Sequence, residues 1–237
     1  MAAGAIAELA LHERGVQIGT HIATLGGRVS DRPFGTYEDD LAVLDDKAFP
    51  VLDATAAEAM KAAIEEARLA GDSVGGVLET AVIGLAGGYG EPWFDTVESV
   101  LAHILFAIPA IKGVEFGEGF ALAGMRGSEA NDAFMKDNGR IVTATNRNGG
   151  INGGITNGMP ICFRCAVKPT PSIGMLQKTV DMVTGNETTI SIGGRHDPCI
   201  VHRAAAVVNA CTALALLDLV TMRDGNVPRN GAAWNTV

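Results

Sequence analysis

The feature that most constrains the fold of this sequence is an apolar stretch near its C-terminus. Residues 204–220 are almost entirely aliphatic and are interrupted only by Asn209, Thr212 and Asp218. A bilayer requires about 20 apolar residues, and this stretch has about 17. We therefore predict a long, mostly buried helix over residues 203–219 and no membrane span. No basic region precedes the first apolar residues, so we also predict no export signal.

The remaining sequence mixes helical and strand patterns without a regular alternation of the two. Such a mixture favours an α+β fold with antiparallel sheets in one domain over residues 1–221, followed by a loose tail over residues 222–237. Asp95 is placed to cap the helix that we predict at residues 95–107. Helices are predicted at 2–14, 53–70 and 95–107, and strands at 16–25, 76–85, 114–123, 141–145, 161–167 and 188–192.

The composition narrows the class of function. The formal net charge is −9 and aromatic residues make up 5% of the chain, which argues against a nucleic-acid partner. Only four cysteines are present, and we predict a reduced, cytoplasmic protein. Residues 140–203 carry seven basic and three acidic side chains, a net charge of +4. This block suits an anionic small molecule, although scattered, solvated side chains would give the same count.

A glycine-rich run lies within the basic block. Residues 148–158 contain five glycines, which permit left-handed backbone and close approach to a phosphate or a flat ring. The run is neither a P-loop nor a dinucleotide-binding fingerprint, because the required spacing and flanking residues are missing. We predict a loop that faces a ligand. The alternative is a pair of tight turns.

Two further motifs concentrate polar side chains. Lys168-Pro-Thr-Pro-Ser172 could present a cation and two hydroxyls to a phosphate or a ribityl chain, or it could be a stiff surface loop. The sequence Gly-Gly-Arg-His-Asp-Pro-Cys at 193–199 offers an anion-binding Arg195, a titratable His196 and a proton-accepting Asp197. The alternative for this motif is a turn before the last helix.

A zinc site has some support in the spacing but not in the expected geometry. Cys162-x-x-Cys165 and His196-x-x-Cys199-x-x-His202 resemble zinc-binding spacings. A strand over residues 161–167 would send the first two cysteines to opposite faces. We therefore predict no metal site.

Taken together, the motifs resemble those of chorismate synthase, a lyase family of the shikimate pathway. The resemblance covers residues 2–220. It is carried by Gly-Asp-Ser-Val-Gly-Gly-Val at 71–77, Ile-Pro-Ala-Ile-Lys-Gly-Val at 108–114 and Gly-Ser-Glu-Ala-Asn-Asp at 127–132, and also by the segments 145–161, 168–173 and 194–199.

The resemblance implies a fold in which a helical layer lies between two antiparallel β-sheets, usually in a homotetramer. It implies the 1,4-anti elimination of phosphate from 5-enolpyruvylshikimate 3-phosphate to give chorismate, a step of aromatic amino acid biosynthesis. Reduced FMN would be required, with NADPH as a source of its electrons. The family's N-terminal third, which carries proton-donating histidines and substrate-binding arginines, has no counterpart here. A truncated, catalytically inactive fragment or assembly partner is therefore the alternative.

The same resemblance implies site residues. Asp197 matches a family aspartate that assists proton movement near the flavin. The cofactor contacts would be Pro109, Ala110, Asn146, Gly153, Lys168, Pro169, Thr170, Pro171, Ser172 and Arg195.

Overall fold

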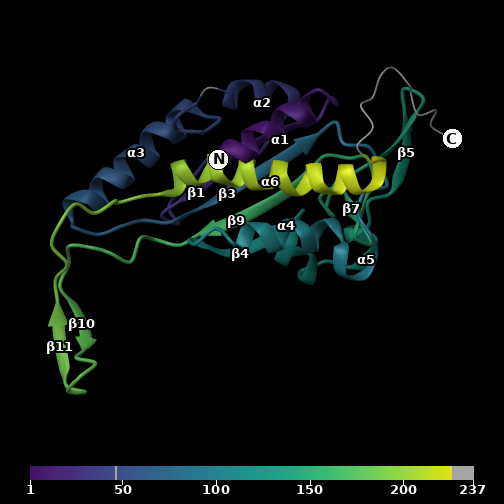
Figure 1. Cartoon of the computed structure of the whole chain (residues 1–237). Helices are drawn as coiled ribbons and strands as arrows, with labels where there is room; N and C mark the ends of the chain where they lie inside the picture. Colours follow the sequence, from purple (N-terminus) through teal and green to yellow (C-terminus); the bar gives the residue numbers. More distant parts are fainter. Residues whose placement is uncertain (46, 226–237) are drawn as a thin grey trace.

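The computed structural model describes residues 1–45 and 47–225, and its centre is a five-stranded antiparallel sheet (Figure 1). The strand order is β2-β1-β3-β9-β4, and three two-stranded ribbons lie outside the sheet. The sheet strands are β1 (Gln17–Leu25), β2 (Val29–Ser30), β3 (Gly76–Ile83), β4 (Ile111–Phe116) and β9 (Ile161–Val167). The ribbon strands are β5 (Phe134–Asp137), β6 (Arg140–Thr143), β7 (Ile151–Asn152), β8 (Ile155–Thr156), β10 (Gln177–Val180) and β11 (Glu187–Ile190).

Helices cover the sheet and connect its strands. They are α1 (Ala2–His12), α2 (Tyr37–Leu44), α3 (Ala54–Leu69), α4 (Val97–Phe106), α5 (Gly127–Ala130) and α6 (Val201–Asp224), with two short 3-10 helices at Trp93–Asp95 and Gly119–Gly124. The α+β class with antiparallel sheets is confirmed. Residues 222–224 of the expected tail form the last turn of α6, and residues 226–237 lie outside the described residues.

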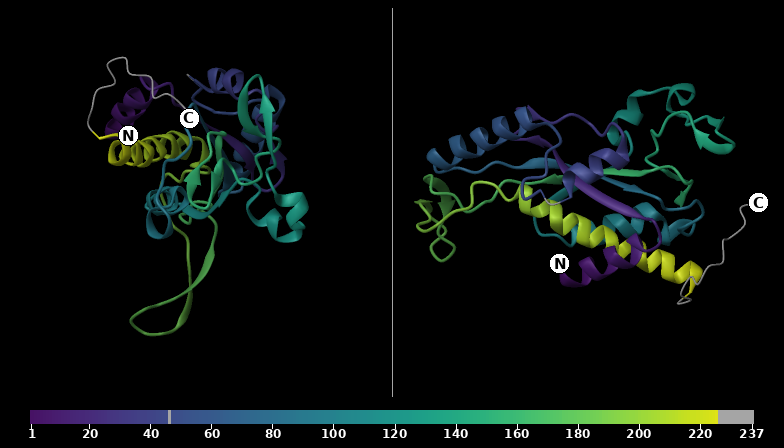
Figure 2. Two further views of the ribbon diagram at one scale, coloured as in Figure 1. Left: turned by 90° about the vertical axis from the view of Figure 1, so that its right-hand side faces the viewer. Right: turned by 90° about the horizontal axis from the view of Figure 1, so that it is seen from above.

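The apolar C-terminal stretch forms α6, which packs on one face of the sheet beside α1 and α4 (Figure 2). At 24 residues, α6 is longer than predicted, and by length and composition alone it could cross a membrane. Half of its most apolar window is buried within the protein, as in a core helix. A Cβ atom at Gly4 of α1 would lie 2.3 Å from the Cβ of Ala210, so the two helices approach closely only because residue 4 is glycine.

The two faces of the sheet differ in chemistry. On β9, residues Ile161, Phe163, Cys165 and Val167 are buried, while the residues between them are half-buried or exposed. On β1, Thr20 Oγ1 donates to Asn209 Oδ1 of α6 at 2.6 Å. We call the side facing α6 the inner face and the opposite side the outer face. Strand alternation thus separates an apolar inner face from a more polar outer face.

A row of charged side chains crosses the outer face. His21, Glu79, Arg164 and Glu115 stand opposite one another on β1, β3, β9 and β4. His21 Nε2 lies 2.9 Å from Glu79 Oε2, and Arg164 Nε lies 2.9 Å from Glu115 Oε1. We call these four residues the charge row.

His21 is fully buried at one end of the charge row. Its Nδ1 lies 2.9 Å from Asp31 Oδ2, so both ring nitrogens face carboxylate oxygens. Because ionised carboxylates only accept hydrogen bonds, both nitrogens donate and the ring is protonated. Burial opposes this charge, but the hydrogen bonds that the ring donates to Asp31 and Glu79 outweigh burial and raise the pKa of His21. Burial likewise opposes the charge of Asp31, but its hydrogen bonds from His21, Leu52 and Asp53 lower its pKa.

Two sequence predictions about these elements are wrong. The strand predicted at 114–123 begins at Ile111 and ends at Phe116, because Gly117 and Gly119 have φ of 56° and 53° and turn the chain out of the sheet. Asp95 does not cap α4. Thr96 does, since its side-chain oxygen accepts from Ser99 N at 3.0 Å.

We expect the stability of the protein to depend on pH through His21. Because the pKa of His21 is raised in the folded protein, its protonation stabilises the fold. This stabilisation is fully present below the ordinary value of 6.5 and is lost as pH rises through the folded pKa. The contribution of Asp31 is present above its ordinary value of 3.8 and is lost as pH falls through the lowered pKa. His21→Gln should lower the free energy of unfolding by about 3 kcal/mol at mildly acidic pH.

Urea unfolding between about pH 5 and about pH 9 checks this expectation. The difference between the unmodified chain and His21→Gln should shrink as pH rises above 6.5. His103→Gln, at an exposed position of α4, is the matched control and should leave the profile unchanged. A His21→Gln difference that is constant across this range would show that folding does not raise the pKa of His21.

Candidate functional site

Three loops meet at one end of the sheet, where β9 finishes. They are residues 71–76, 168–174 and 193–199. Ser73 Oγ donates to the carbonyl of Thr170 at 2.6 Å, and Val74 N donates to the carbonyl of Pro198 at 2.8 Å. Gly174 N donates to Gly71 O at 2.9 Å. We call this region the Lys168 end.

Glycine makes the meeting of these loops possible. A Cβ atom at Gly75 would lie 2.4 Å from the carbonyl oxygen of Val167 and 2.9 Å from the ring of Pro169. Real Cβ atoms do not approach backbone so closely, so residue 75 must lack one. The motif at 71–77 therefore serves to bring the loop that begins at Lys168 against the sheet.

Most of the predicted site residues lie at the Lys168 end. The backbone N–H of Lys168 donates to Ala110 O at 2.9 Å, which joins the segment after α4 to the loop after β9. The structure thus brings together Pro109, Ala110, Lys168, Pro169, Thr170, Pro171, Ser172, Arg195 and Asp197.

The Lys168 end contains a hollow with a basic lining. Its volume is about 570 Å³, and it is lined by Arg195, His196, Asp197, Pro198, His202 and Arg203. Asp197 forms an ion pair with Arg203 of α6. Among the described residues, neither Lys168 nor Arg195 has an ion-pair partner, so both cations are available to an anion.

The two histidines that line this hollow, His196 and His202, differ in their contacts. His196 Nδ1 lies 3.0 Å from Ser172 Oγ, and its Nε2 lies 2.7 Å from Ile192 O. His202 packs beside Phe49 with ring centroids 5.8 Å apart. Burial lowers the pKa of His202, so its ring is neutral near pH 7. Its Nδ1 is buried and has no hydrogen-bond partner among the described residues.

Asn146 and Gly153 lie at the other end of β9. Asn146 Nδ2 donates to the carbonyl of Pro160 at 2.8 Å, just before the strand begins. Gly154 O accepts from Val97 N at the start of α4, whereas Ala110 follows the end of that helix. Seven strand residues at about 3.3 Å each separate the two ends by roughly 20 Å. Within one chain, these two residues are therefore not brought together with the rest of the predicted site.

The glycine-rich run forms tight turns. Its five glycines all have positive φ, and Gly153 and Gly154 make the two-residue turn between β7 and β8. Added Cβ atoms would lie 2.5 Å from Cys162 O at Gly149 and 2.4 Å from Pro160 O at Gly150. At Gly153 nothing lies within 4 Å. Packing thus accounts for the first two glycines, and contact with a ligand remains a prediction for Gly153.

Asp132, which belongs to one of the quoted motifs, fixes the start of the glycine-rich run. Its carboxylate accepts from the backbone N–H groups of Arg147 and Asn148 at 2.8 and 2.9 Å and from Thr145 Oγ1 at 2.7 Å. Burial opposes its charge, but these bonds outweigh burial and lower its pKa. The carboxylate is therefore a structural acceptor.

The cysteine positions agree with the strand argument against a Cys162–Cys165 metal site. Cys165 is buried on the inner face, while Cys162 lies on the outer face, 3.3 Å from the hydroxyl of Tyr37. Burial raises the pKa of Cys162 to about 11 and that of Cys165 to about 12, so both are neutral thiols. Residues 1–45 and 47–225 contain no group of three or more His, Cys, Asp or Glu side chains arranged to hold a metal ion.

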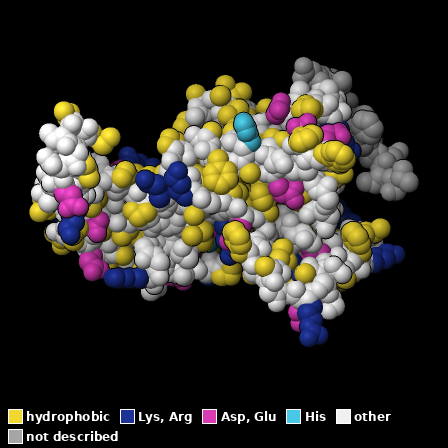
Figure 3. All heavy atoms as spheres, turned by 90° about the horizontal axis from the view of Figure 1, so that it is seen from below, with side chains coloured by type: hydrophobic (Ala, Val, Ile, Leu, Met, Phe, Trp, Pro, Cys, Tyr) yellow, Lys and Arg dark blue, Asp and Glu magenta, His cyan; other side chains and the backbone are white. Residues whose placement is uncertain are grey.

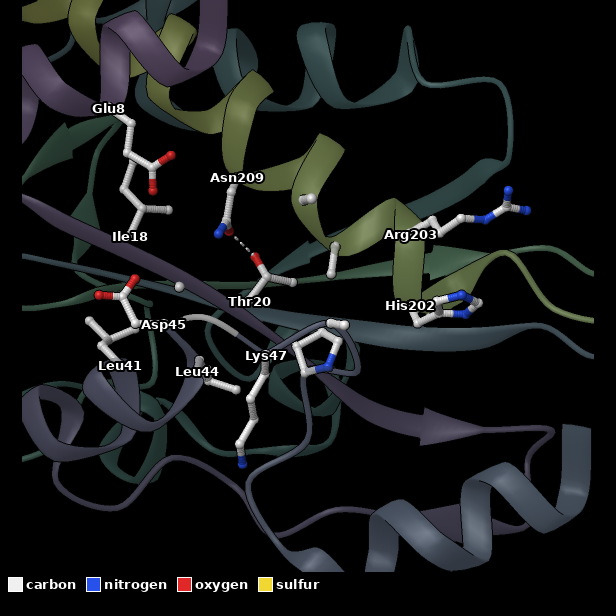
Figure 4. Close-up of a pocket in the computed structure, with 15 residues that line it drawn as sticks. Glu8, Ile18, Thr20, Leu41, Leu44, Asp45, Lys47, His202, Arg203 and Asn209 are labelled. Atoms are coloured by element: carbon white, nitrogen blue, oxygen red, sulfur yellow. Dashed lines mark hydrogen bonds between the residues drawn. The ribbon is translucent and has the colours of Figure 1, made fainter. Parts of the chain in front are cut away.

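A second hollow, of about 330 Å³, lies where α1, β1, α2 and α6 meet (Figure 4). His202 and Arg203 line this hollow as well as the basic one. Glu8 and Asp45 also line it, and burial, followed by the charge of Asp45, raises the pKa of Glu8. The sequence gives no signal for this hollow, because its lining comes from four elements far apart in the chain.

The ribbon of β10 and β11 projects from the Lys168 end, and we call residues 175–190 the arm (Figures 1 and 2). Met182 and Val183 at its tip are 94% and 95% exposed. In the view from below, the arm extends at the left of the body (Figure 3). Side chains of both charges lie among hydrophobic ones over the body on that face (Figure 3).

Comparison with known proteins identifies relatives over nearly the whole chain. A family model described as "Chorismate synthase" matches residues 1–221. The chorismate synthase of Aeropyrum pernix is 47% identical over 231 residues, which cover 96% of this chain and 60% of that protein. A chorismate synthase of Dehalococcoides mccartyi is 46% identical over 227 residues, with 96% and 62% covered.

A solved structure is also similar to this chain. A chain described as "Crystal Structure of Chorismate Synthase" has a TM-score of 0.76 and 28% sequence identity, covering 94% of this chain and 62% of that chain. The present chain therefore spans about 60% of the length of the curated relatives that it matches.

Alanine substitutions at the neighbouring Gly153 and Gly154 should separate backbone strain from packing. Both residues have positive φ, so each substitution should cost about 1–2 kcal/mol of strain. Only at Gly154 would the new Cβ meet Thr96, 2.4 Å from its Cγ2, which should add about 1–3 kcal/mol. Thermal unfolding of the two variants measures the difference. Equal destabilisation would mean that Thr96 moves aside and that packing does not fix this turn.

Proposed function

Because this chain belongs to the chorismate synthase family, we propose that it acts in a carbon–oxygen lyase of the shikimate pathway. The reaction is the 1,4-anti elimination of phosphate from 5-enolpyruvylshikimate 3-phosphate, which yields chorismate. The observation that carries the proposal is the Lys168 end. There Arg195 and Asp197, which match family cofactor and proton-transfer positions, line one basic hollow, and Ser172 of the loop at 168–174 lies 3.0 Å from His196 of the same lining.

The residues at the Lys168 end fit reduced FMN, which is an anion with a hydroxylated chain. Lys168 and Arg195 supply positive charge without carboxylate partners among the described residues. Thr170 Oγ1 is buried and, in the described part of the chain, has no hydrogen-bond partner. A buried hydroxyl without a partner costs about 1–3 kcal/mol, which a bound ligand would recover. When bound, reduced FMN supplies electron density to the allylic C–O bond that breaks.

The chain's own residues have distinct tasks in this proposal. Lys168 and Arg195 bind the anionic groups of the cofactor and the substrate. Asp197 accepts and passes on a proton, and its ion pair with Arg203 holds the carboxylate at the hollow. The loop at 71–76 keeps these groups together through Ser73 and Val74.

We further propose a homotetramer in the cytoplasm, with NADPH as the source of electrons for FMN. The separation of Asn146 and Gly153 from the Lys168 end supports association of copies. A neighbouring copy would bring its Gly153 turn to the Lys168 end of the first. No single chain would then contain a whole cofactor site.

Anaerobic phosphate release tests the activity. We expect the chain to release phosphate from 5-enolpyruvylshikimate 3-phosphate with reduced FMN, and Asp197→Asn to slow release by about 10²–10⁴-fold. Lys168→Met should weaken FMN binding. Lys178→Met, on exposed β10, is the matched control and should change neither quantity. A folded chain that neither binds reduced FMN nor releases phosphate would support the alternative of an inactive fragment.

Mixed assemblies test the composite site. Lys168→Met impairs one end, and Gly153→Asp places a negative charge at an open position of the other. Each variant alone should bind FMN weakly, whereas the two dissociated and reassembled together should regain tight sites. Failure to regain them, or tight binding by Gly153→Asp alone, would show that the Gly153 turn is not part of the cofactor site.

A further inference from the structure

His196 joins two loops of the Lys168 end, although the proposed reaction assigns it no task. Its Nδ1 lies 3.0 Å from Ser172 Oγ in the loop at 168–174. Its Nε2 lies 2.7 Å from the carbonyl oxygen of Ile192 in the chain that leads to Arg195. Both His196 and Ser172 are half-buried.

These two contacts determine which atom carries each hydrogen. A carbonyl oxygen only accepts, so Nε2 of the neutral ring must carry the hydrogen and donate it to Ile192 O. Nδ1 then has a lone pair, and the hydroxyl of Ser172 donates its single hydrogen to it. Ser172 Oγ is left with lone pairs alone. Toward a ligand, it can act only as an acceptor.

Thr170, two residues earlier, has a hydroxyl that can still donate its hydrogen to a ligand. The carbonyl of Thr170 already accepts from Ser73 Oγ at 2.6 Å. Its own hydroxyl is buried without a partner among the described residues, so its hydrogen remains available. The same loop therefore offers a donor at Thr170 and an acceptor at Ser172.

We propose that His196 is a positioning residue that fixes Ser172 as an acceptor, so that Ser172 binds a hydroxyl of the flavin's ribityl chain and not its phosphate. Phosphate oxygens only accept hydrogen bonds, and they are bound by the donors Lys168, Thr170 and Arg195. The assignment rests on the proposed function for the identity of the ligand. The hydrogen-bond direction at Ser172 rests on the protein alone.

Paired binding measurements with FMN and with riboflavin, which lacks the phosphate, test the ligand assignment. Ser172→Ala should weaken the binding of both flavins by the same factor, about fivefold to tenfold. Lys168→Met should weaken FMN binding and leave riboflavin binding nearly unchanged. A loss for FMN alone in Ser172→Ala would place Ser172 at the phosphate and overturn the proposal.

Variants of His196 separate positioning from simple packing. His196→Ala removes both contacts, whereas His196→Asn retains an amide oxygen near the position of Nδ1 that can accept from Ser172. We expect the asparagine variant to recover part of the riboflavin affinity that the alanine variant loses. His103→Ala, on the exposed side of α4, is the control and should bind both flavins like the unmodified chain. Equal losses in the two His196 variants would mean that the ring acts only by its bulk.

Nitrogen-15 NMR of the ligand-free chain tests the hydrogen-bond direction independently of any flavin. At a pH where the ring is neutral, His196 should show a protonated Nε2 and an unprotonated Nδ1. The reverse tautomer would overturn the proposal whatever the flavins do. If neither flavin binds while the expected tautomer is observed, the proposed function fails and Ser172 remains an acceptor for another donor ligand.

Discussion

The charge row on the outer face sets the register on which the rest of the structure depends. Because side chains alternate along a strand, a slip of one residue in β9 would turn Arg164 toward α6 and Phe163 toward the outer face. The same register therefore forms the pairs Arg164–Glu115 and Glu79–His21 on the outer face and buries the apolar side chains on the inner face. That register places the end of β9 beside Ala110 and so positions the Lys168 end.

Much of the fold could be predicted where one local pattern decides the structure. The strand predicted at 161–167 and the helices predicted at 2–14 and 53–70 have strong periodicity, and the structure reproduces them within two residues. The error at 114–123 arose where glycines alone decide the end of a strand. The short helix Tyr37–Leu44 was not predicted, since its place depends on Leu41 and Leu44 packing over Gly19.

The candidate site was predictable in its residues but not in its arrangement. Motifs at 168–172 and 193–199 are close in sequence, and their meeting needs only the intervening arm. The sequence does not show that Ser73 and Val74 contact both motifs, because these contacts depend on the absence of a side chain at Gly75. Nor does the sequence reveal that Asn146 and Gly153 lie a strand's length away. The buried pairing of His21 with Asp31 and Glu79 likewise joins elements whose proximity only the fold defines.

The arm is an excursion whose two ends are held at its base. Gly174 N donates to Gly71 O, and Ser191 Oγ donates to Gly174 O at 3.2 Å, so the chain leaves and returns at nearly the same place. Closing a longer or shorter loop between fixed ends changes the free energy only slowly with length, by about 0.6 kcal/mol per doubling. The arm is therefore modular: its length and tip can diverge among related chains, or accept an inserted peptide, while the loops at its base keep their geometry.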